Sequence, residues 1–304
     1  MNLYLATSLL LASVTITVIP PSSKNYEFNF GTENIPHPAK IEKGGEDAYY
    51  GNKYVLCVAD GVGSWASEGV DAGKYSRKLT SNVAAFFAEE PAKFTAKPKD
   101  LIVKATLENH EIGSSTIVIV IINPETGVAN ASKVGDSCYI ILRPDPLTGK
   151  LFIFYRSKEQ QHGFNFPYQV GTDGDSPLTA VEFSHQLMYG DIVVVGSDGM
   201  FDNLYDETTL EEVEKLKDTT PGDIARRLAQ LSFKLSLNRK YFSPFAKAGR
   251  ESNFPYMGGK SDDIAVVVGI VIKPQPTEEP KPKVPEEPKP QSALVIAQIS
   301  KDSP

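Results

Sequence analysis

Cysteine is scarce in this sequence, with only Cys57 and Cys138 among 304 residues. Both lie inside apolar, strand-like runs, which is typical of buried thiols, and neither has a His or a second Cys at the spacing of a zinc site. Histidine is also rare, with four residues, and no two of them stand at helical i, i+4 spacing. These absences disfavour soft and borderline metals, so a metal bound here should prefer oxygen ligands.

Positive charge is in deficit, because 31 Lys and Arg stand against 38 Asp and Glu, a formal net charge of −7. An acidic surface repels nucleic-acid phosphates, so binding to DNA or RNA is not expected. The same balance suits a protein that keeps carboxylates for divalent cations. The composition, 41% hydrophobic and 23% charged, is that of an ordinary globular chain that can bury a core without disulfides.

The longest uncharged apolar run lies at the N-terminus. Residues 3–18 carry no charge, but they are fewer than a comfortable membrane span requires. The run resembles a signal-peptide core that lacks a preceding basic residue and an evident cleavage site. Three interpretations stay open: a secretory or membrane-anchoring segment, a degenerate organelle leader, or no targeting role. Membrane contact is expected only if the run is retained.

Composition divides the chain into three parts. Residues 1–38 join the apolar run to a spacer rich in Pro, Ser and Asn, residues 39–273 carry the periodic patterns of a globular domain, and residues 274–304 repeat Pro, Glu and Lys. Such a tail buries no core, so we expect an extended, solvated segment.

Strand signals dominate the globular part. Residues 48–60 suggest a hairpin that turns at Gly51-Asn52, and residues 115–123 form a continuous β-branched run expected for a strand buried on both faces. Two more buried strands are expected within 191–198 and 263–272. Helices are predicted at 71–88, 98–111, 207–217 and 221–237. This order favours an α+β fold in which helices cover packed sheets, and it lacks the regular alternation of a Rossmann fold.

Acidic residues stand at the ends of the predicted strands, each near glycine: Glu46, Asp47, Asp60, Asp198, Asp262 and Asp263. If these ends meet at one edge of the sheets, they form a cage of carboxylates that cannot all stay ionised without cations. Oxygen-only ligation indicates Mg²⁺ or Mn²⁺, and the glycines let backbone carbonyls approach the ions. Each Asp-Gly pair alone is typical of a turn, so the order of the whole set carries the prediction.

The segments around these acids resemble those of the type 2C (PPM) metal-dependent protein phosphatases. The matching segments occur in the family's order and cover nearly all of residues 39–273: GEDAYY, VADGVG, GSST, VGDS, GSDGMFDN and GKSDDIAVVV. Three further segments, ADGVGSW, EQQHGFNFPYQ and YFSPFAKAG, resemble the eukaryotic organelle subgroup related to the mitochondrial phosphatases. A mitochondrial location is what that resemblance implies.

The resemblance implies a four-layer αββα sandwich of two mostly antiparallel β-sheets flanked by helices. It also implies two Mg²⁺ or Mn²⁺ ions, both bridged by Asp60. The remaining implied roles are a carbonyl ligand from Gly61, carboxylate ligands from Glu46, Asp198 and Asp262, a third, weaker ion at Asp136, and Asp47 ordering metal-bound water.

The implied activity is hydrolysis of phosphoserine and phosphothreonine in proteins. Asp60, Asp198 and Asp262 would act through a hydroxide shared by the two ions, which attacks phosphorus directly. No nucleophilic Cys or Ser and no phosphoenzyme is then needed. The expected partner is a phosphoprotein substrate, and the expected state is a monomer.

The sequence departs from the family pattern at two points. Val62 stands where many members have a His that is a candidate general acid, so the leaving oxygen must take its proton from metal-bound water or another group. Glu42 and Lys43 stand where many members carry a phosphate-binding Arg. Lys43 is the candidate point charge there, against the competing interpretation of a surface lysine.

These departures keep two alternatives open. One is a catalytically weak pseudophosphatase that acts as a binding module, although the intact acidic set argues against it. The other is an interaction protein that works through its Pro-rich tail, because such tails can engage aromatic grooves.

Overall fold

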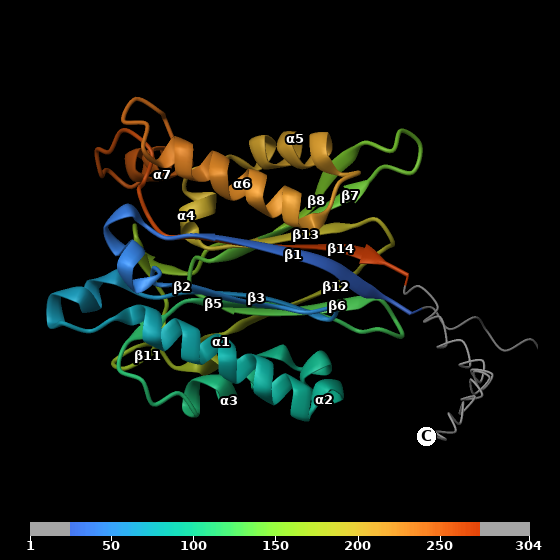
Figure 1. Cartoon of the computed structure of the whole chain (residues 1–304), viewed down its shortest axis with the longest axis horizontal. Helices are drawn as coiled ribbons and strands as arrows, with labels where there is room; N and C mark the ends of the chain where they lie inside the picture. The colour runs from blue at the N-terminus through green and yellow to red at the C-terminus, as the bar shows by residue number, and fades with distance from the viewer. Residues whose placement is uncertain (1–24, 274–304) are drawn as a thin grey trace, which may run out of the picture. The chain divides into compact units, whose positions relative to one another are not determined.

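A computed structural model describes residues 25–273, and the predicted leader and Pro-rich tail lie outside the described residues. Two five-stranded sheets pack face to face, and helices cover both outer faces (Figure 1). All strand pairs in these sheets are antiparallel. The predicted α+β fold with four αββα layers is therefore confirmed.

The first sheet has the strand order β12-β6-β5-β3-β2 and the second β1-β14-β13-β7-β8. In the first sheet the strands are β2 (Asp47–Gly51), β3 (Val55–Asp60), β5 (Ile117–Ile122), β6 (Val128–Val134) and β12 (Val181–Gln186). In the second they are β1 (Glu27–Ile35), β7 (Cys138–Pro144), β8 (Leu151–Arg156), β13 (Ile192–Gly196) and β14 (Ile264–Ile272). Two short pairs stand apart: β9 (Gln161–Gly163) with β10 (Phe166–Pro167), and β4 (Ser114–Ser115) with β11 (Val170–Gly171).

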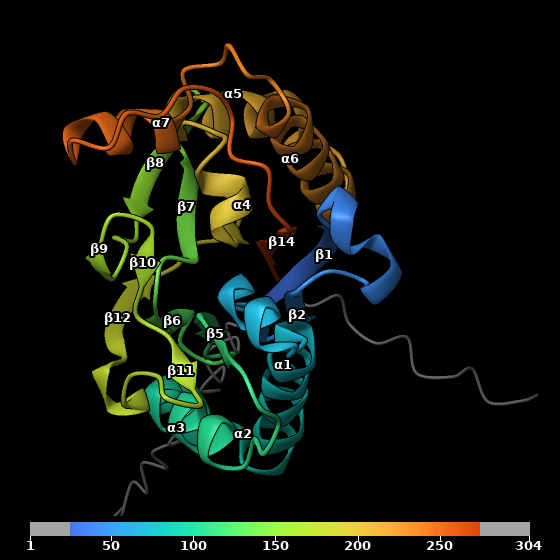
Figure 2. The same ribbon diagram turned by 90° about the vertical axis from the view of Figure 1, so that its left-hand side faces the viewer.

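Each sheet has its own layer of helices. The first sheet is covered by α1 (Ala72–Glu89), α2 (Pro91–Ala96) and α3 (Pro98–Leu107), and the second by α4 (Asp198–Phe201), α5 (Asp206–Leu216) and α6 (Pro221–Ser236). Helix α7 (Pro244–Glu251) lies at one end of the sandwich (Figure 2). Short 3-10 helices lie at η1 (Pro38–Lys43), η2 (Gly63–Glu68) and η3 (Pro177–Thr179). The predicted helix 98–111 ends earlier, at Leu107, and no helix between residues 25 and 273 is long and apolar enough to cross a membrane.

The core has three layers, which explains why the central strands are apolar on both faces. In β14, Ala265 and Val267 face the opposite sheet, whereas Val266 and Val268 face the helices α4 to α6. Every one of these side chains is fully buried. A strand buried on both faces reads as a continuous apolar run rather than an alternating one. Cys57 and Cys138 are buried free thiols, as predicted.

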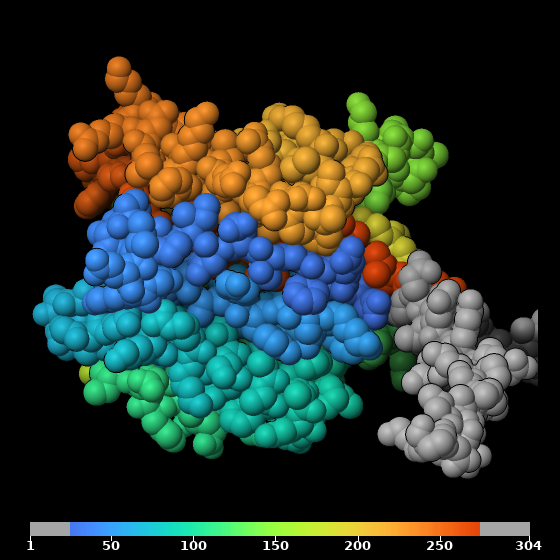
Figure 3. Space-filling view, in the orientation of Figure 1, coloured from blue at the N-terminus to red at the C-terminus, as the bar shows by residue number. Residues whose placement is uncertain are grey.

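The predicted start of the domain at residue 39 is wrong. Residues 27–35, assigned to the spacer, form β1, which pairs along its whole length with β14 from Glu27↔Ile272 to Ile35↔Ile264. Phe28 is the one buried residue of β1. Because the rest of this edge strand is partly exposed, its composition gave no strand signal in the sequence. In the space-filling view, the segment with β1 fills the side of the sandwich between the two helical layers (Figure 3).

Candidate active site

The strand ends that carry the predicted acids meet at one edge of the sandwich. Asp60 ends β3, and it stands directly opposite Asp47 at the start of the antiparallel strand β2. Asp198 follows the end of β13, and Asp262 precedes the start of β14, which is the antiparallel neighbour of β13. Because the end of one antiparallel strand lies beside the start of the next, four segments distant in sequence bring their carboxylates together.

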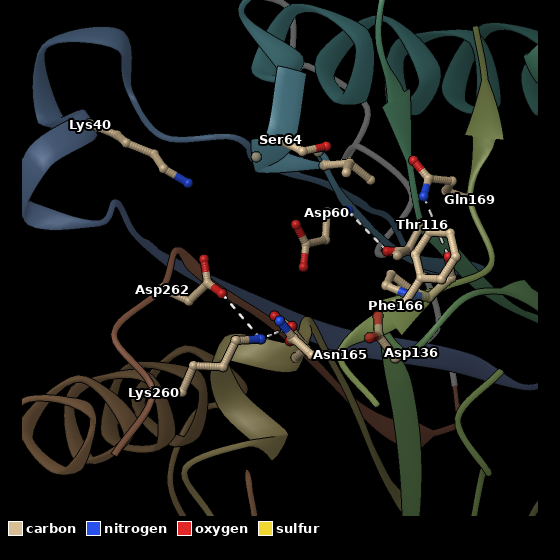
Figure 4. Close-up of a pocket in the computed structure, with 15 residues that line it drawn as sticks. Lys40, Asp60, Ser64, Thr116, Asp136, Asn165, Phe166, Gln169, Lys260 and Asp262 are labelled. Atoms are coloured by element: carbon tan, nitrogen blue, oxygen red, sulfur yellow. Dashed lines mark hydrogen bonds and ion pairs between the residues drawn. The ribbon is translucent and has the colours of Figure 1, made fainter. Parts of the chain in front are cut away.

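These acids line a cavity of about 350 Å³. Its acidic lining consists of Asp60, Asp136, Asp198 and Asp262. Figure 4 shows Asp60 in the middle of the cavity, with Lys40 and Lys260 reaching toward it from two separate segments. Glu46 and Asp47 are buried next to this lining. The hairpin β9–β10 and helix α7 lie at the end of the sandwich that faces the viewer in Figure 2.

Burial and mutual repulsion perturb these acids. Burial, followed by the charges of Asp47 and Asp198, holds the pKa of Asp60 well above its usual range. Burial and the neighbouring Asp263 do the same for the pKa of Asp47. Burial raises the pKa of Asp136 to about 7. Carboxyl groups in this state are relieved by protons or by cations.

Several buried carboxylate oxygens have no hydrogen-bond partner, and this observation tests whether the residues fit a metal. Both Oδ atoms of Asp47, one of Asp136 and one of Asp198 are buried without a partner. Buried polar atoms are seldom left unpaired, and oxygen-only donors suit Mg²⁺ and Mn²⁺. No three such side chains among residues 25–273 already stand in coordination geometry. The donor set therefore fits divalent ions by chemistry and by its unpaired oxygens, with lysines bridging the remaining acids.

Two lysines divide the acid cluster between them. Lys40 Nζ from η1 donates to Glu46 and to Asp263 Oδ2, the latter at 2.8 Å. Lys260 Nζ donates to Asp198 and to Asp202, the latter at 2.8 Å. Burial alone would lower the pKa of Lys260, but the adjacent carboxylates outweigh it and raise that pKa well above the usual range.

The segment around β9 and β10 forms another wall of the cavity. Asn165, Phe166, Pro167 and Gln169 line the cavity there. Gln169 Oε1 accepts from Ser114 Oγ at 2.6 Å, and Ser114 Oγ accepts in turn from Trp65 Nε1 at 2.6 Å. This chain of hydrogen bonds ties the η2 turn to the wall, so Trp65 is a packing residue of the loop.

His162 packs within this wall. Its Nε2 lies 2.9 Å from Asp175 Oδ1, and its ring stacks on Tyr168 with centroids 3.9 Å apart. None of the four histidines, all of which lie within residues 25–273, lines the cavity. With Val62 after Asp60-Gly61, no imidazole stands ready to protonate a leaving oxygen.

The structure gathers most of the residues singled out from the sequence. Asp60, Gly61, Asp136, Asp198 and Asp262 line the cavity, with Glu46 and Asp47 adjoining. Lys43 is exposed and lies outside the lining, because η1 directs Lys40 inward and leaves Lys43 at its exposed end. Sequence reasoning missed Lys40, Asp202 and Lys260. The last two stand inside the motifs GSDGMFDN and GKSDD, whereas Lys40 carries no local signal.

Comparisons with known proteins identify relatives of this chain. A family model described as Stage II sporulation protein E (SpoIIE) matches residues 50–241. The probable protein phosphatase 2C 71 of Oryza sativa subsp. japonica is 36% identical, over 85% of this chain and 55% of that protein. The protein phosphatase PTC7 homolog fig of Drosophila mojavensis is 32% identical, over 76% of this chain and 79% of that protein.

Two solved structures share the fold. The photosystem II phosphatase PBCP superimposes with a TM-score of 0.73 at 31% identity, covering 80% of this chain and 98% of that one. The catalytic domain of the serine threonine protein phosphatase PstP, solved with 2 manganese ions, gives 0.58 at 18% identity, covering 82% and 100%. The chain belongs to the protein phosphatase 2C family. It spans between 51% and 60% of the length of the first plant relatives that it matches.

Proposed function

We propose that this protein is a metal-dependent phosphatase that hydrolyses phosphoserine and phosphothreonine in proteins. One observation carries the proposal: buried carboxylates from separate strand ends converge on one cavity of a protein phosphatase 2C fold, and several of their oxygens lack partners. Placement in the organelle-type subgroup, with a mitochondrial location, is a hypothesis that rests on the segments ADGVGSW, EQQHGFNFPYQ and YFSPFAKAG.

The acids would hold two Mg²⁺ or Mn²⁺ ions. We assign Asp60 to both ions, Asp198 and Asp262 with the Gly61 carbonyl to the first, and Glu46 to the second. Asp47, directly opposite Asp60 in the β2–β3 register, orders the water around this group. Such ions supply a hydroxide nucleophile at neutral pH and positive charge for the phosphoryl oxygens. No side chain of the protein then has to act as a nucleophile.

Lys40 is the phosphate-binding residue in this proposal. Its side chain is 28% exposed and lines the cavity, so a phosphoryl group that enters from solvent can reach its ammonium. A lysine on a short turn provides a point charge rather than the fixed, bidentate contact of an arginine. The residues of the β9–β10 wall then border the peptide side of the substrate, because they line the same cavity as the acids.

The test is phosphate release from phosphoserine, phosphothreonine and phosphotyrosine peptides by the full chain. We expect manganese-dependent release from the first two peptides, and complete loss in excess chelator. Release that persists in chelator would contradict the proposal. Tight manganese binding without turnover on any peptide would instead favour the non-catalytic binding module.

A further inference from the structure

The ammonium of Lys260 is surrounded by carboxylates. Lys260 Nζ donates to Asp198 and to Asp202 (2.8 Å), and it lies 3.3 Å from Asp262 Oδ2. The side chain of Lys260 is only 15% exposed. Figure 4 shows it extended into the cavity, with Asp262 close to its end. A cation therefore already stands among three oxygen donors of the kind that bind divalent metals.

The position of this ammonium is built into the fold. Asn203, a fully buried residue, accepts from the Lys260 backbone N–H at 3.0 Å and donates through Nδ2 to the Lys260 carbonyl at 2.8 Å. The ring of Phe245 lies 5.1 Å from Lys260 Nζ, within the range of a cation–π contact. Lys260 is thus held at both its backbone and its ammonium, unlike a surface lysine.

Some carboxylate oxygens of the acids near Lys260 accept no hydrogen bond from it. Asp198 accepts from Lys260 through Oδ2, whereas its Oδ1 is buried without a partner. Asp136 accepts from Gln161 through Oδ2 at 3.1 Å, and its Oδ1 is likewise buried without a partner. Asp136 is 3% exposed and lines the same cavity as Asp198 and Lys260. Asp136 and Asp198 therefore keep unpaired oxygens on the side of the cavity where Lys260 contacts Asp198 and Asp202.

We propose that Lys260 is a tethered cation that takes the place of a third metal ion beside Asp136, Asp198 and Asp202. The inference rests on the proposed function, because it concerns the same acid cluster. Neutralising Lys260 would remove one positive charge from a buried group of carboxylates, which is an unfavourable state unless another cation enters. The protein as it exists should accordingly bind two divalent ions, and removal of the ammonium should open a site for a third.

The experiment counts manganese ions per chain at saturation, by calorimetric titration and by metal analysis after equilibrium dialysis. It compares the full-length wild type with Lys260→Gln and with the control Lys240→Gln, which removes an equal charge from an exposed residue. We expect two ions for the wild type, three for Lys260→Gln and two for Lys240→Gln. Lys260→Arg, which retains the charge, should stay at two.

Each outcome decides the inference. A third ion in the wild type, or no additional ion in folded Lys260→Gln, would overturn it. The wild-type count requires no substitution, so it remains decisive if circular dichroism shows that Lys260→Gln does not fold. If the wild type binds two ions and releases phosphate, and folded Lys260→Gln also binds two, the inference is overturned but the proposed function stands. A wild type that binds no manganese and releases no phosphate overturns the proposed function as well.

Discussion

The acid cavity has two differently constructed sides. On one side, Lys40 projects from the short surface helix η1 and contacts Glu46 and Asp263 with 28% of its side chain exposed. On the other side, Lys260 is 15% exposed, contacts three carboxylates and has its backbone fixed by Asn203. The first lysine can exchange its partners for a ligand from solvent, whereas the second is a permanent part of the cluster.

This difference shows how one site can use two ammonium groups for separate purposes. A charge on a short, accessible turn suits recognition of a substrate that arrives and leaves. A charge fixed between buried acids suits long-term neutralisation, because an unpaired buried charge is costly. Among the neighbouring acids, Asp47, Asp136 and Asp198 have buried oxygens without a hydrogen-bond partner, which are available to the proposed ions.

The largest effect should follow from changing the acid that lies between the two sides. Asp60→Asn removes a charge that both ions would share, so we expect phosphate release to fall by about 10²–10³-fold or more. Steady-state kinetics on a phosphothreonine peptide with saturating manganese measures this. Asp218→Asn, on an exposed residue, is the matched control and should retain activity. Activity of Asp60→Asn at the control level would refute the metal assignment.

Lys40→Met should remove the positive charge from the solvent-accessible side of the cavity. Loss of a charged contact to phosphate costs about 1.5–3 kcal/mol, so we expect kcat/KM for a phosphopeptide to fall by roughly 10–100-fold. The loss should appear mainly as a higher KM, and it can be measured with the same peptide assay. Lys43→Met, in the same turn but exposed, should have little effect. The reverse ranking of the two variants would restore Lys43 as the phosphate contact.

Metal removal should reveal the repulsion among the buried acids as a pH dependence of stability. The folded-state pKa is raised for Asp47, Asp60, Asp136, Asp202 and Asp262. For such an acid, the stabilising contribution is present below the unfolded value near 3.8 and is lost as the pH rises through the folded value, about 7 for Asp136. Asp198, whose pKa is lowered by Lys260 despite burial, acts in the opposite direction.

We therefore expect the metal-free protein to melt at a lower temperature at pH 7.5 than at pH 5.5. Each 1 kcal/mol lost corresponds to roughly 2–4 °C for a domain of this size. Manganese should reverse the trend, because it binds the ionised acids. Thermal melts in chelator and in manganese measure the melting temperature as a function of pH with and without metal. Asp136→Asn should reduce the pH dependence of the melting temperature of the metal-free protein. A melting temperature that rises with pH in chelator would contradict this account.

The smallest effect is expected at an ion cluster away from the cavity. Hydrogen bonds from Arg227 and then Lys215 lower the pKa of Glu212 on α5. Its contribution to the free energy of unfolding is present above pH 4.5 and disappears as the pH falls through the lowered value. Glu212→Gln should cost about 0.2–1 kcal/mol at pH 7, measured by urea denaturation, and less at pH 3.5. Glu211→Gln, on the exposed face of the same helix, is its control. An equal loss at both pH values would show that packing rather than charge is responsible.

The α+β class could be predicted from the residues because the central strands are buried on both faces, whereas the four αββα layers were implied by the family resemblance. The continuous runs of β5, β13 and β14 are unmistakable, and their antiparallel order places the acids at strand ends. The strand β1 was missed for the opposite reason. As an edge strand with polar residues, it depends on pairing with β14, and that partner is more than 200 residues away in sequence.

The sequence predicted the acids of the cavity but not the two lysines that neutralise them. Asp60, Asp198 and Asp262 are marked by their place after or before apolar strands. The directions of Lys40 and Lys260 depend on how a short turn and a loop sit against the folded acids, and no periodicity encodes that. Lys43 was the candidate because it stands where many family members carry a phosphate-binding Arg, whereas Lys40 was not considered and reaches the acids only through the geometry of η1.

The most direct test of the account is to locate manganese in crystals of the full chain by anomalous diffraction. Two anomalous peaks should appear in the cavity, with the Asp60 carboxylate in contact with both and the Lys260 ammonium still beside Asp202. Absence of peaks at saturating manganese, or peaks away from Asp60, Asp198 and Asp262, would contradict it.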